Sequence, residues 1–467
     1  MHKLLIRDSL CVAAILLLAS CGGGGSSDSD VPAVTADSQT VIDTPAEDAP
    51  LETSTETVPA SPVESDCSVS GINQWVDDSM RDYYIYYDQV PVLDLASFET
   101  PEELVKQLRV DPDRFSYVND QSTNDQYYEE GISAGFGFWI SYLNDIAHFR
   151  KIIGGSPADV AGIKRGDVLI SVNGIPERDI DDDLWSELFS DTHEHQTMTV
   201  QTGDDPPRDV TIAYSEYRIN TVPEASFYTT DNGAKIGYFL ISNFLIPTTD
   251  AINTVLAWLV DNQVDDLILD LRYNGGGRSN VARTLASQIV GESFTGEPFQ
   301  IRHNNDKYSE EDYTRYFESE PYSLNLSRLI VLTTEKTASA SESIINGLQP
   351  YIDVVVIGDT TSGKPFTSRS NDNCGKSLHA MHAIRTNSVG VSVANGITPD
   401  CYVADEYLFE TDDARDSLTS AGLDYIINAT CQTSPPAAKA DSHSAFHRHN
   451  RTATPEAIME RPADIID

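Results

Sequence analysis

The sequence predicts a multidomain α/β protein whose largest domain contains a mostly parallel sheet. Between about residues 218 and 431, apolar runs typical of buried strands alternate with stretches of helical periodicity, which is the pattern of an α/β core. The expected strands are 236–241, 266–271, 329–333 and 354–357, and the expected helices are 249–261, 280–290 and 341–348. Residues 131–217 combine glycines with strand-like alternation, and the whole 67–431 stretch is too long for one ordinary core.

Residues 67–130 predict a small helical domain. Thr100-Pro101-Glu102-Glu103 is a capping box with proline at the first helical position. An aromatic stripe earlier in this block is more typical of a core than of a ligand site. The block shows no chemistry of its own.

The first 21 residues predict an export signal. Lys3 and Arg7 give it a positive start, and a short apolar run leads to Leu18-Ala19-Ser20-Cys21. This ending resembles a bacterial lipobox, which implies cleavage before Cys21 and lipidation of that residue. Gly22 after the cysteine resembles lipoproteins forwarded to the outer membrane. We therefore expect a bacterial periplasmic protein held to the outer membrane through a lipid anchor only.

Two further segments lack core-forming residues. Residues 22–66 and 432–467 are poor in large apolar side chains, so we expect a flexible linker and a disordered tail.

Charge excludes one class of partner. The formal net charge is −42 at pH 7, with 73 acidic against 31 basic residues, which argues against nucleic acid and against electrostatic binding to anionic lipid. No His/Cys cluster has metal-ligand spacing, and we expect no metal and no cofactor.

Four cysteines remain after the export signal. In an oxidising compartment they allow three pairings. We favour Cys374–Cys401, around an intervening pair of strands, with Cys67–Cys431 joining the two ends of the folded region.

Ser339 is the candidate nucleophile. It lies between the apolar run 329–332 and a helical stretch that begins near Ser341, which places it at a strand-to-helix turn. The first N–H groups of a helix lack internal partners and carry partial positive charge. The N–H of Ala340 can therefore receive the oxyanion that forms when Ser339 attacks a carbonyl.

Lys364 is the candidate base. It follows Ser339 by 25 positions, in the loop after a second buried strand at 354–357. A lysine can take a proton from serine when burial disfavours its ammonium form. The pattern thus predicts a serine peptidase with a Ser–Lys dyad.

The stretch 156–174 resembles a PDZ domain, with a short helix, a strand and an Asn173-Gly174 turn. The resemblance implies a β-barrel that binds a peptide C-terminus. The free carboxylate would lie on the N–H groups of the loop formed by Gly135, Phe136, Gly137 and Phe138, and the peptide would add as a strand. The alternative is that these glycines and hydrophobic residues only build the barrel.

Several runs together resemble the C-terminal processing (tail-specific) peptidases, in a lipoprotein branch of that family. They are 267–277, the Ser339 run, 356–364 and Gly396-Ile397-Thr398-Pro399-Asp400. The resemblance covers most of residues 67–431 and implies a catalytic domain of the crotonase/ClpP-like fold.

The resemblance also assigns roles to single residues. Ser339 is the nucleophile and Lys364 the general base, and the loop that starts at Asn274 faces the nucleophile. Relatives often have proline at the position of Gly275, so the implied second oxyanion donor is Gly276. Asp270 and Arg272 are interpreted as an internal ion pair. Many relatives have a base-orienting glutamine where this chain has Ser368.

Two functions remain open. The first is an endopeptidase that recognises the C-termini of exported proteins or peptides. The second, suggested by the missing glutamine, is a catalytically weak lipoprotein that binds peptides or acts as a scaffold. The presence of both Ser339 and Lys364 favours the enzyme. His379 and His382 are interpreted as strand-face residues rather than bases, because apolar alternation places them on a strand. The sequence does not indicate an oligomeric state.

Overall fold

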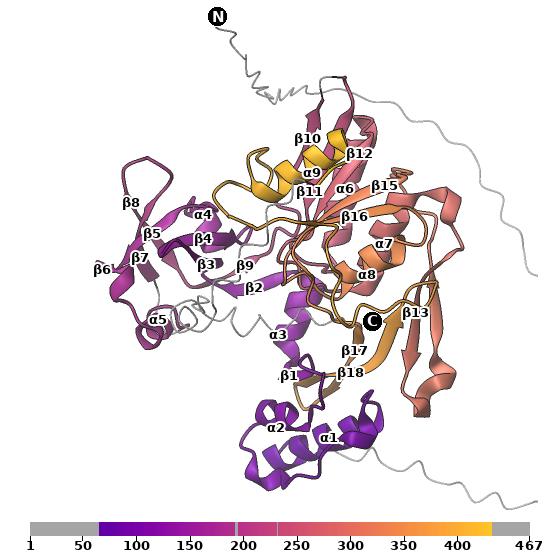
Figure 1. Ribbon diagram of the computed structural model, residues 1–467. Coiled ribbons are helices and arrows are strands. Elements are labelled where there is room, and N and C mark those ends of the chain that lie inside the picture. The colour runs from indigo at the N-terminus through magenta and orange to yellow at the C-terminus, as the bar shows by residue number, and fades with distance from the viewer. Residues whose placement is uncertain (1–64, 192–194, 231, 432–467) are drawn as a thin grey trace, which may run out of the picture. The chain divides into compact units, whose positions relative to one another are not determined.

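A computed structural model describes residues 65–191, 195–230 and 232–431 (Figure 1). The predicted export signal with Cys21, nearly all of the expected linker, and the expected tail lie outside these residues. Within the described ranges, no helix has both the length and the apolar character needed to cross a membrane.

A six-stranded sheet forms the centre of the largest block. Five of its strands run parallel, in the order β11, β12, β15, β16 and β19, and β10 pairs antiparallel with β11 at one edge. This confirms the predicted mostly parallel sheet. The strands are β10 (Ala225–Thr229), β11 (Lys235–Leu240), β12 (Asp266–Asp270), β15 (Arg328–Thr333), β16 (Asp353–Gly358) and β19 (Cys401–Tyr402).

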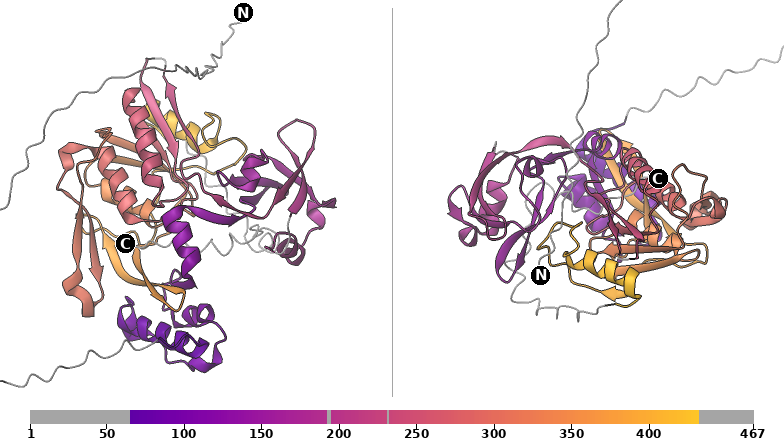
Figure 2. Two further views of the ribbon diagram at one scale, coloured as in Figure 1. Left: turned by 180° about the vertical axis from the view of Figure 1, so that it is seen from behind. Right: turned by 90° about the horizontal axis from the view of Figure 1, so that it is seen from above.

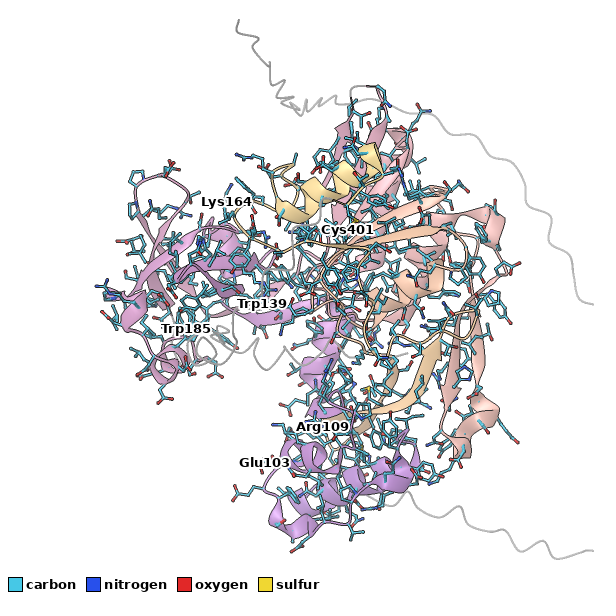
Figure 3. All side chains as sticks on the ribbon, viewed as in Figure 1. Glu103, Arg109, Trp139, Lys164, Trp185 and Cys401 are labelled. Atoms are coloured by element: carbon cyan, nitrogen blue, oxygen red, sulfur yellow. A yellow bond between two sulfur atoms is a disulfide. The ribbon has the colours of Figure 1, made fainter. Side chains whose placement is uncertain are left out.

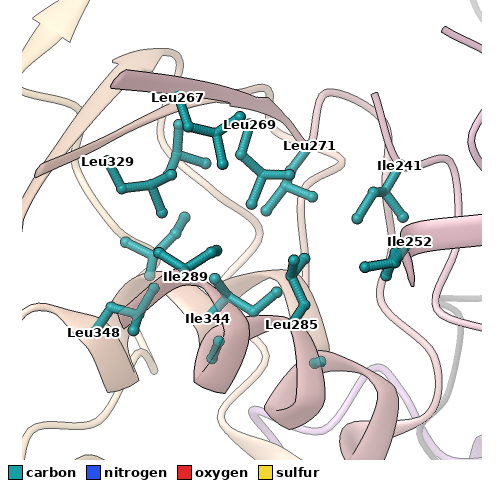
Figure 4. Close-up of a cluster of buried hydrophobic side chains, with 14 of the residues drawn as sticks. Ile241, Ile252, Leu267, Leu269, Leu271, Leu285, Ile289, Leu329, Ile344 and Leu348 are labelled. Atoms are coloured by element: carbon teal, nitrogen blue, oxygen red, sulfur yellow. The ribbon is translucent and has the colours of Figure 1, made fainter. Parts of the chain in front are cut away.

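Helices cover both faces of this sheet. Leu267 and Leu269 of β12 pack with α6 (Thr248–Asp261), α7 (Ser279–Val290) and α8 (Ala340–Leu348) in one hydrophobic cluster (Figure 4). Ile268, on the opposite face, packs with α9 (Ser417–Asn428). Burial on both faces explains why these strands appear in the sequence as uninterrupted apolar runs.

A second sheet is antiparallel. Strand β18 pairs with β1, β13 and β17, and β14 extends the sheet from β13. Because β1 belongs to the block expected to be purely helical, that expectation is incomplete. A four-residue strand shows no periodicity, and only its pairing with β18 defines it. The strands are β1 (Tyr117–Asp120), β13 (Pro298–Asn304), β14 (Tyr313–Tyr316), β17 (Phe366–Asn373) and β18 (Lys376–Thr386).

The N-terminal helices pack on this second sheet. Helices α1 (Val69–Asp82) and α2 (Pro101–Leu108) share one core with Phe366 and Leu378 of the β17–β18 hairpin. Figure 2 shows the two helices next to the strands of this hairpin. Helix α2 begins as predicted, because the Thr100 hydroxyl accepts from the Glu103 N–H at 3.3 Å. Short α3 (Gln121–Asp125) and a π-helical turn (Gln126–Glu130) follow β1.

Residues 132–218 form a further β-rich block. It contains a sheet in the order β3, β4, β5, β7 and β8, with β6 on β5, and a separate β2–β9 pair. Phe136, Phe138 and Trp185 lie in its core, and Figure 3 labels Trp185. Its elements are β2 (Ile132–Gly135), β3 (Phe138–Leu143), β4 (Ile146–Ile152), α4 (Pro157–Val160), β5 (Val168–Val172), β6 (Ile175–Pro176), α5 (Asp182–Leu188), β7 (His195–Gln201), β8 (Arg208–Ala213) and β9 (Ser215–Arg218). Across the described residues, short 3₁₀ turns cover Tyr87–Gln89, Leu95–Ser97, Glu177–Asp179, Glu292–Phe294 and Asp306–Glu311.

The four cysteines form two disulfides, but not in the favoured pairing. Cys67 bonds to Cys374 and Cys401 bonds to Cys431. The predicted Cys374–Cys401 bond is wrong because these residues belong to different sheets. Cys374 lies in the turn of the β17–β18 hairpin, against which α1 brings Cys67, whereas Cys401 begins β19, next to the face that α9 and Cys431 cover.

Replacing Cys67 and Cys374 together by serine should lower the free energy of unfolding by about 2–5 kcal/mol, because the bond closes a long loop. Urea denaturation of the oxidised protein measures this. The Cys401→Ser/Cys431→Ser variant is the matched control. Its residues are 30 positions apart rather than 307, so a smaller loss is expected. A non-reduced peptide map that joins Cys374 to Cys401 would contradict the structure.

Candidate active site

Ser339 occupies a strained turn between β15 and α8. Its backbone has φ 61° and ψ −110°, a region that side chains other than glycine rarely adopt, and its side chain is fully buried. Such strain at a strand-to-helix turn is typical of a serine held as a nucleophile. The sequence prediction of this turn is confirmed.

The carboxylate of Glu342 joins this turn to the loop that carries Lys364. One oxygen, Oε2, accepts the N–H groups of Ser339 at 2.7 Å and Lys364 at 2.9 Å. The other, Oε1, accepts the Gly363 N–H at 2.7 Å and the Thr361 hydroxyl at 2.5 Å. Two residues that are 25 positions apart in the sequence thus donate to the same oxygen atom, which brings the predicted nucleophile and base into one site.

Lys364 is completely buried. Its Nζ lies 5.2 Å from the centroid of the Phe115 ring, which the N-terminal block supplies. An amine that is buried beside an aromatic ring is shielded from bulk water. The role of Lys364 as a base stays a prediction.

The loop from Asn274 to Gly277 packs against the nucleophile turn, as predicted. The Asn274 carbonyl accepts the Ala338 N–H and the Ser341 hydroxyl, each at 3.0 Å. A Cβ built on Gly276 would lie 2.8 Å from Cβ of Ser339 and 2.9 Å from the Ala340 nitrogen. Only glycine allows so close an approach, and with φ +111° only glycine adopts this backbone without strain.

The two expected oxyanion donors differ in their surroundings. Ala340 is the first residue of α8, so its N–H belongs to the helix terminus beside Ser339. The N–H of Gly276 instead donates to Oδ1 of Asn274 at 2.9 Å. The second donor stays a prediction, since that N–H would have to be shared with, or released by, the Asn274 side chain.

Ser368 and the two histidines lie on the second sheet. Ser368 is fully buried on β17, opposite Met381 of β18, and its orienting role stays a prediction. His379 and His382 lie on β18, as expected for strand residues. Burial lowers the pKa of His379 to about 3, with help from the positive charges of Lys364 and Arg278. The imidazole is therefore neutral at neutral pH. It stacks on the Tyr117 ring, with 4.4 Å between the two ring centroids.

Asp270 and Arg272 form the internal ion pair that was predicted. Arg272 Nε lies 2.8 Å from Asp270 Oδ2, and both side chains are fully buried. Burial raises the pKa of Asp270, while Arg272 opposes that rise. Arg272 also binds Asp416 and Asp405, and Arg165 of the β-rich block contacts the same two carboxylates. This network anchors the chain directly before the Asn274 loop.

Arg385 of β18 is a site residue that the sequence prediction missed. Its Nη2 donates to Ser339 Oγ at 3.1 Å and to the Lys364 carbonyl at 3.2 Å. The signal in the sequence was weak: one arginine near the end of a strand that mixes polar and apolar residues. Only the folded sheet shows that it reaches the nucleophile.

The predicted peptide-binding loop, Gly135 to Phe138, is held rigidly. Both of its phenylalanines are buried in the core of their own block. The carbonyl of Phe136 accepts the Ala158 N–H at 3.0 Å, and that of Gly137 accepts the Ile153 N–H at 2.9 Å. Peptide binding stays a prediction. Within the described ranges, no group of His, Cys, Asp or Glu side chains is arranged to hold a metal ion.

Comparison with known families shows what three regions of the chain resemble. Residues 235–403 match the model of peptidase family S41, residues 71–117 match the peptidase S41 N-terminal domain, and residues 149–202 match a PDZ domain. The chain therefore contains, in this order, regions similar to three domains found in one class of peptidases.

Individual relatives agree with this class. The chain is 26% identical over 270 residues to the carboxy-terminal processing protease CtpB of Bacillus subtilis, an alignment that covers 54% of this chain and 51% of the relative. It is 27% identical over 298 residues to a probable CtpA-like serine protease of Staphylococcus aureus, an alignment that covers 61% of this chain and 54% of the relative. The chain thus spans about half the length of these curated relatives.

A solved structure shows the fold. The crystal structure of a putative S41 protease from Bacteroides fragilis superposes with a TM-score of 0.65 at 23% identity. The match covers 76% of this chain and 97% of that one. The shared architecture is therefore a mixed α/β S41 peptidase fold.

Replacing His379 by phenylalanine should make the fold more resistant to acid. The folded-state pKa of about 3 lies below the value of 6.5 for an exposed histidine. As the pH falls, the unfolded state therefore takes up the proton first. The stability that the neutral imidazole contributes is complete above pH 6.5 and is lost as the pH falls towards 3.

Urea unfolding at several pH values between 7 and 4 measures this effect. His379→Phe should show a smaller loss of stability across that range than the wild type, whereas His195→Gln, an exposed position on β7, should follow the wild type. Parallel curves for His379→Phe and the wild type would contradict the assignment of a neutral buried imidazole.

Proposed function

We propose that this chain is a periplasmic serine endopeptidase that cleaves exported proteins or peptides with a Ser339–Lys364 dyad and recognises C-termini through its PDZ domain. The observation that carries the proposal is the shared bonding of the two residues. Both donate to Oε2 of Glu342, and Arg385 donates to both.

The chemistry follows the serine–lysine scheme. The uncharged amine of Lys364 takes the proton from Ser339 as Oγ bonds to the scissile carbonyl carbon. The oxyanion lies at the N–H of Ala340, with Gly276 as the second donor. Collapse of this intermediate breaks the C–N bond, and the Lys364 ammonium gives its proton to the leaving amine. Water then attacks the acyl-enzyme while Lys364 takes a proton from it. As the bond between the acyl carbon and Ser339 Oγ breaks, Lys364 returns that proton to Oγ and both residues regain their starting state.

The PDZ domain supplies C-terminus recognition in this proposal. The loop Gly135–Phe138 would place its N–H groups against the terminal carboxylate, and an extended peptide would pair beside the sheet. The bonds that fix the carbonyls of Phe136 and Gly137 keep this loop in one shape without a ligand.

Location is also a proposal. The lipobox-like ending at Cys21 supports export to the periplasm with a lipid anchor, and Gly22 supports the outer membrane as its site. The two disulfides between Cys67, Cys374, Cys401 and Cys431 support an oxidising compartment.

A second candidate is a lipoprotein that binds peptides in the PDZ domain and the cleft but cleaves them poorly. Two observations favour it: serine stands at position 368, where many relatives have glutamine, and the Gly276 N–H donates to Asn274. Wild-type protein that binds peptide but never cleaves would support this candidate.

Ser339→Ala and Lys364→Met should each reduce the cleavage of an unfolded protein such as casein by about 10³-fold or more, because each removes one member of the dyad. The control is Lys106→Met, an exposed lysine of α2, which should cleave like the wild type. Wild-type activity should also rise with pH, because only the uncharged amine accepts a proton. A profile that is flat from acid to neutral pH would count against the lysine base.

A peptide with a free carboxyl end should bind more tightly than the same peptide with an amidated end, because amidation removes the charge that the Gly135–Phe138 loop would receive. Fluorescence anisotropy on the Ser339→Ala protein measures this without cleavage. Equal affinity for the two peptides would reject C-terminus recognition by the PDZ domain.

A further inference from the structure

We infer that Arg385 is a catalytic residue, a fixed positive charge that stabilises Ser339 Oγ as that atom loses its proton. The inference rests on the proposed function of the Ser339–Lys364 site and adds to it a third residue that contacts a reacting atom.

Arg385 is held where it reaches both members of the dyad. Its backbone N–H donates to the Pro365 carbonyl at 2.8 Å, which fixes the end of β18 to the loop that carries the base. From there Nη2 donates to Ser339 Oγ at 3.1 Å and to the Lys364 carbonyl at 3.2 Å. Only 4% of Arg385 is exposed to solvent.

The hydrogen bond to Ser339 has a defined direction. A guanidinium ion has donors and no acceptor, and it keeps its proton throughout the working pH range. Arg385 therefore cannot serve as the base. By donating to Oγ it occupies one lone pair, and the hydroxyl proton has to point to another acceptor, the role proposed for Lys364.

The energetic effect grows during the reaction. In the ground state Arg385 donates to a neutral hydroxyl oxygen. As the O–H bond breaks and the proton moves to Lys364, negative charge builds on Oγ, and a charge-assisted hydrogen bond replaces a weaker one. In a buried site this difference is larger than it would be in water, and differential stabilisation of this kind lowers the barrier.

The same charge also bears on the residue proposed as the base. Nη2 of Arg385 donates to the Lys364 backbone carbonyl at 3.2 Å, so a positive charge lies beside the main chain of that residue. A positive charge in this position disfavours the ammonium form of the Lys364 side chain, and the pH profile measured below tests this.

A purely structural role is the alternative, because a buried arginine that bonds two loops also holds them together. The two roles differ in what they require. A structural bond needs a donor of the right shape, whereas the catalytic role needs a positive charge next to Ser339 Oγ.

The test measures how fast a fluorophosphonate probe labels Ser339 between pH 6 and pH 10, in the wild type and in Arg385→Gln, Arg385→Lys and Arg385→Ala. Labelling reports nucleophile reactivity without any protein substrate. Arg385→Gln should be slower by about 10²-fold, the effect typical of losing one such donor. Its pH profile should move to higher pH, and Arg385→Lys should keep part of the rate.

Added guanidinium ion, at concentrations that leave the protein folded, should restore part of the rate of Arg385→Ala. The matched control is Arg302→Gln. Arg302 is the cross-strand partner of Arg385 on β13, but its guanidinium bonds to Asn304 and Tyr313. This variant should label like the wild type and should gain nothing from guanidinium.

Wild-type rates in a folded Arg385→Gln protein would overturn the inference. So would a loss of rate in Arg385→Gln that neither Arg385→Lys nor guanidinium reverses and that parallels a loss of stability in urea. The proposed function can fail separately. If the probe labels Ser339 of the wild type but the wild type cleaves no protein, the peptidase proposal is refuted. The labelling rates of the variants then still decide the role of Arg385. A wild type whose Ser339 is not labelled at all overturns both.

Discussion

The buried carboxylate of Glu342 is the constraint on which the site depends. It takes four hydrogen bonds, from the nucleophile turn and from the loop that follows β16. A buried carboxylate is tolerated when such bonds replace its water, and the four donors do this for Glu342. In return, Glu342 bonds to Ser339, whose backbone conformation costs about 1–3 kcal/mol by itself. The turn at Ser339 and the loop that carries Lys364 are thereby joined rather than independent.

Four strands of the central sheet, β11, β12, β15 and β16, could be predicted from the sequence because they are buried on both faces, whereas the edge strands β10 and β19 were not predicted. Uninterrupted apolar runs such as 329–333 then mark the strands, and the connecting helices show their own period. The second sheet could not be predicted in this way. Its strands β17 and β18 mix polar and apolar residues, and β1 is defined only by pairing across more than 250 positions. The cysteine pairing was wrong for the same reason, since it depends on which sheet holds Cys374 and which holds Cys401.

The residues of the candidate site differ in the same way in whether the sequence could predict them. The sequence could predict Ser339, Lys364 and the loop at Asn274, because each follows an apolar strand of the central sheet. Reactive groups commonly lie at the C-terminal ends of such strands. Arg385 comes from the second sheet, and no spacing relative to Ser339 indicates that it belongs to the site. Its place depends on the β18 backbone bond to Pro365, a contact between segments that local patterns do not connect.

The charge at the candidate site differs in sign from the net charge of the chain. The chain as a whole carries a formal charge of −42, yet the guanidinium of Arg385 contacts Ser339 Oγ. Surface carboxylates act on the site through screening solvent, whereas this buried guanidinium acts through a medium of low dielectric, so its charge dominates there. In the proposed reaction, negative charge develops at Ser339 Oγ as the proton leaves and moves to the carbonyl oxygen as the new bond forms. A buried guanidinium beside Oγ can therefore favour this step even in a strongly acidic protein.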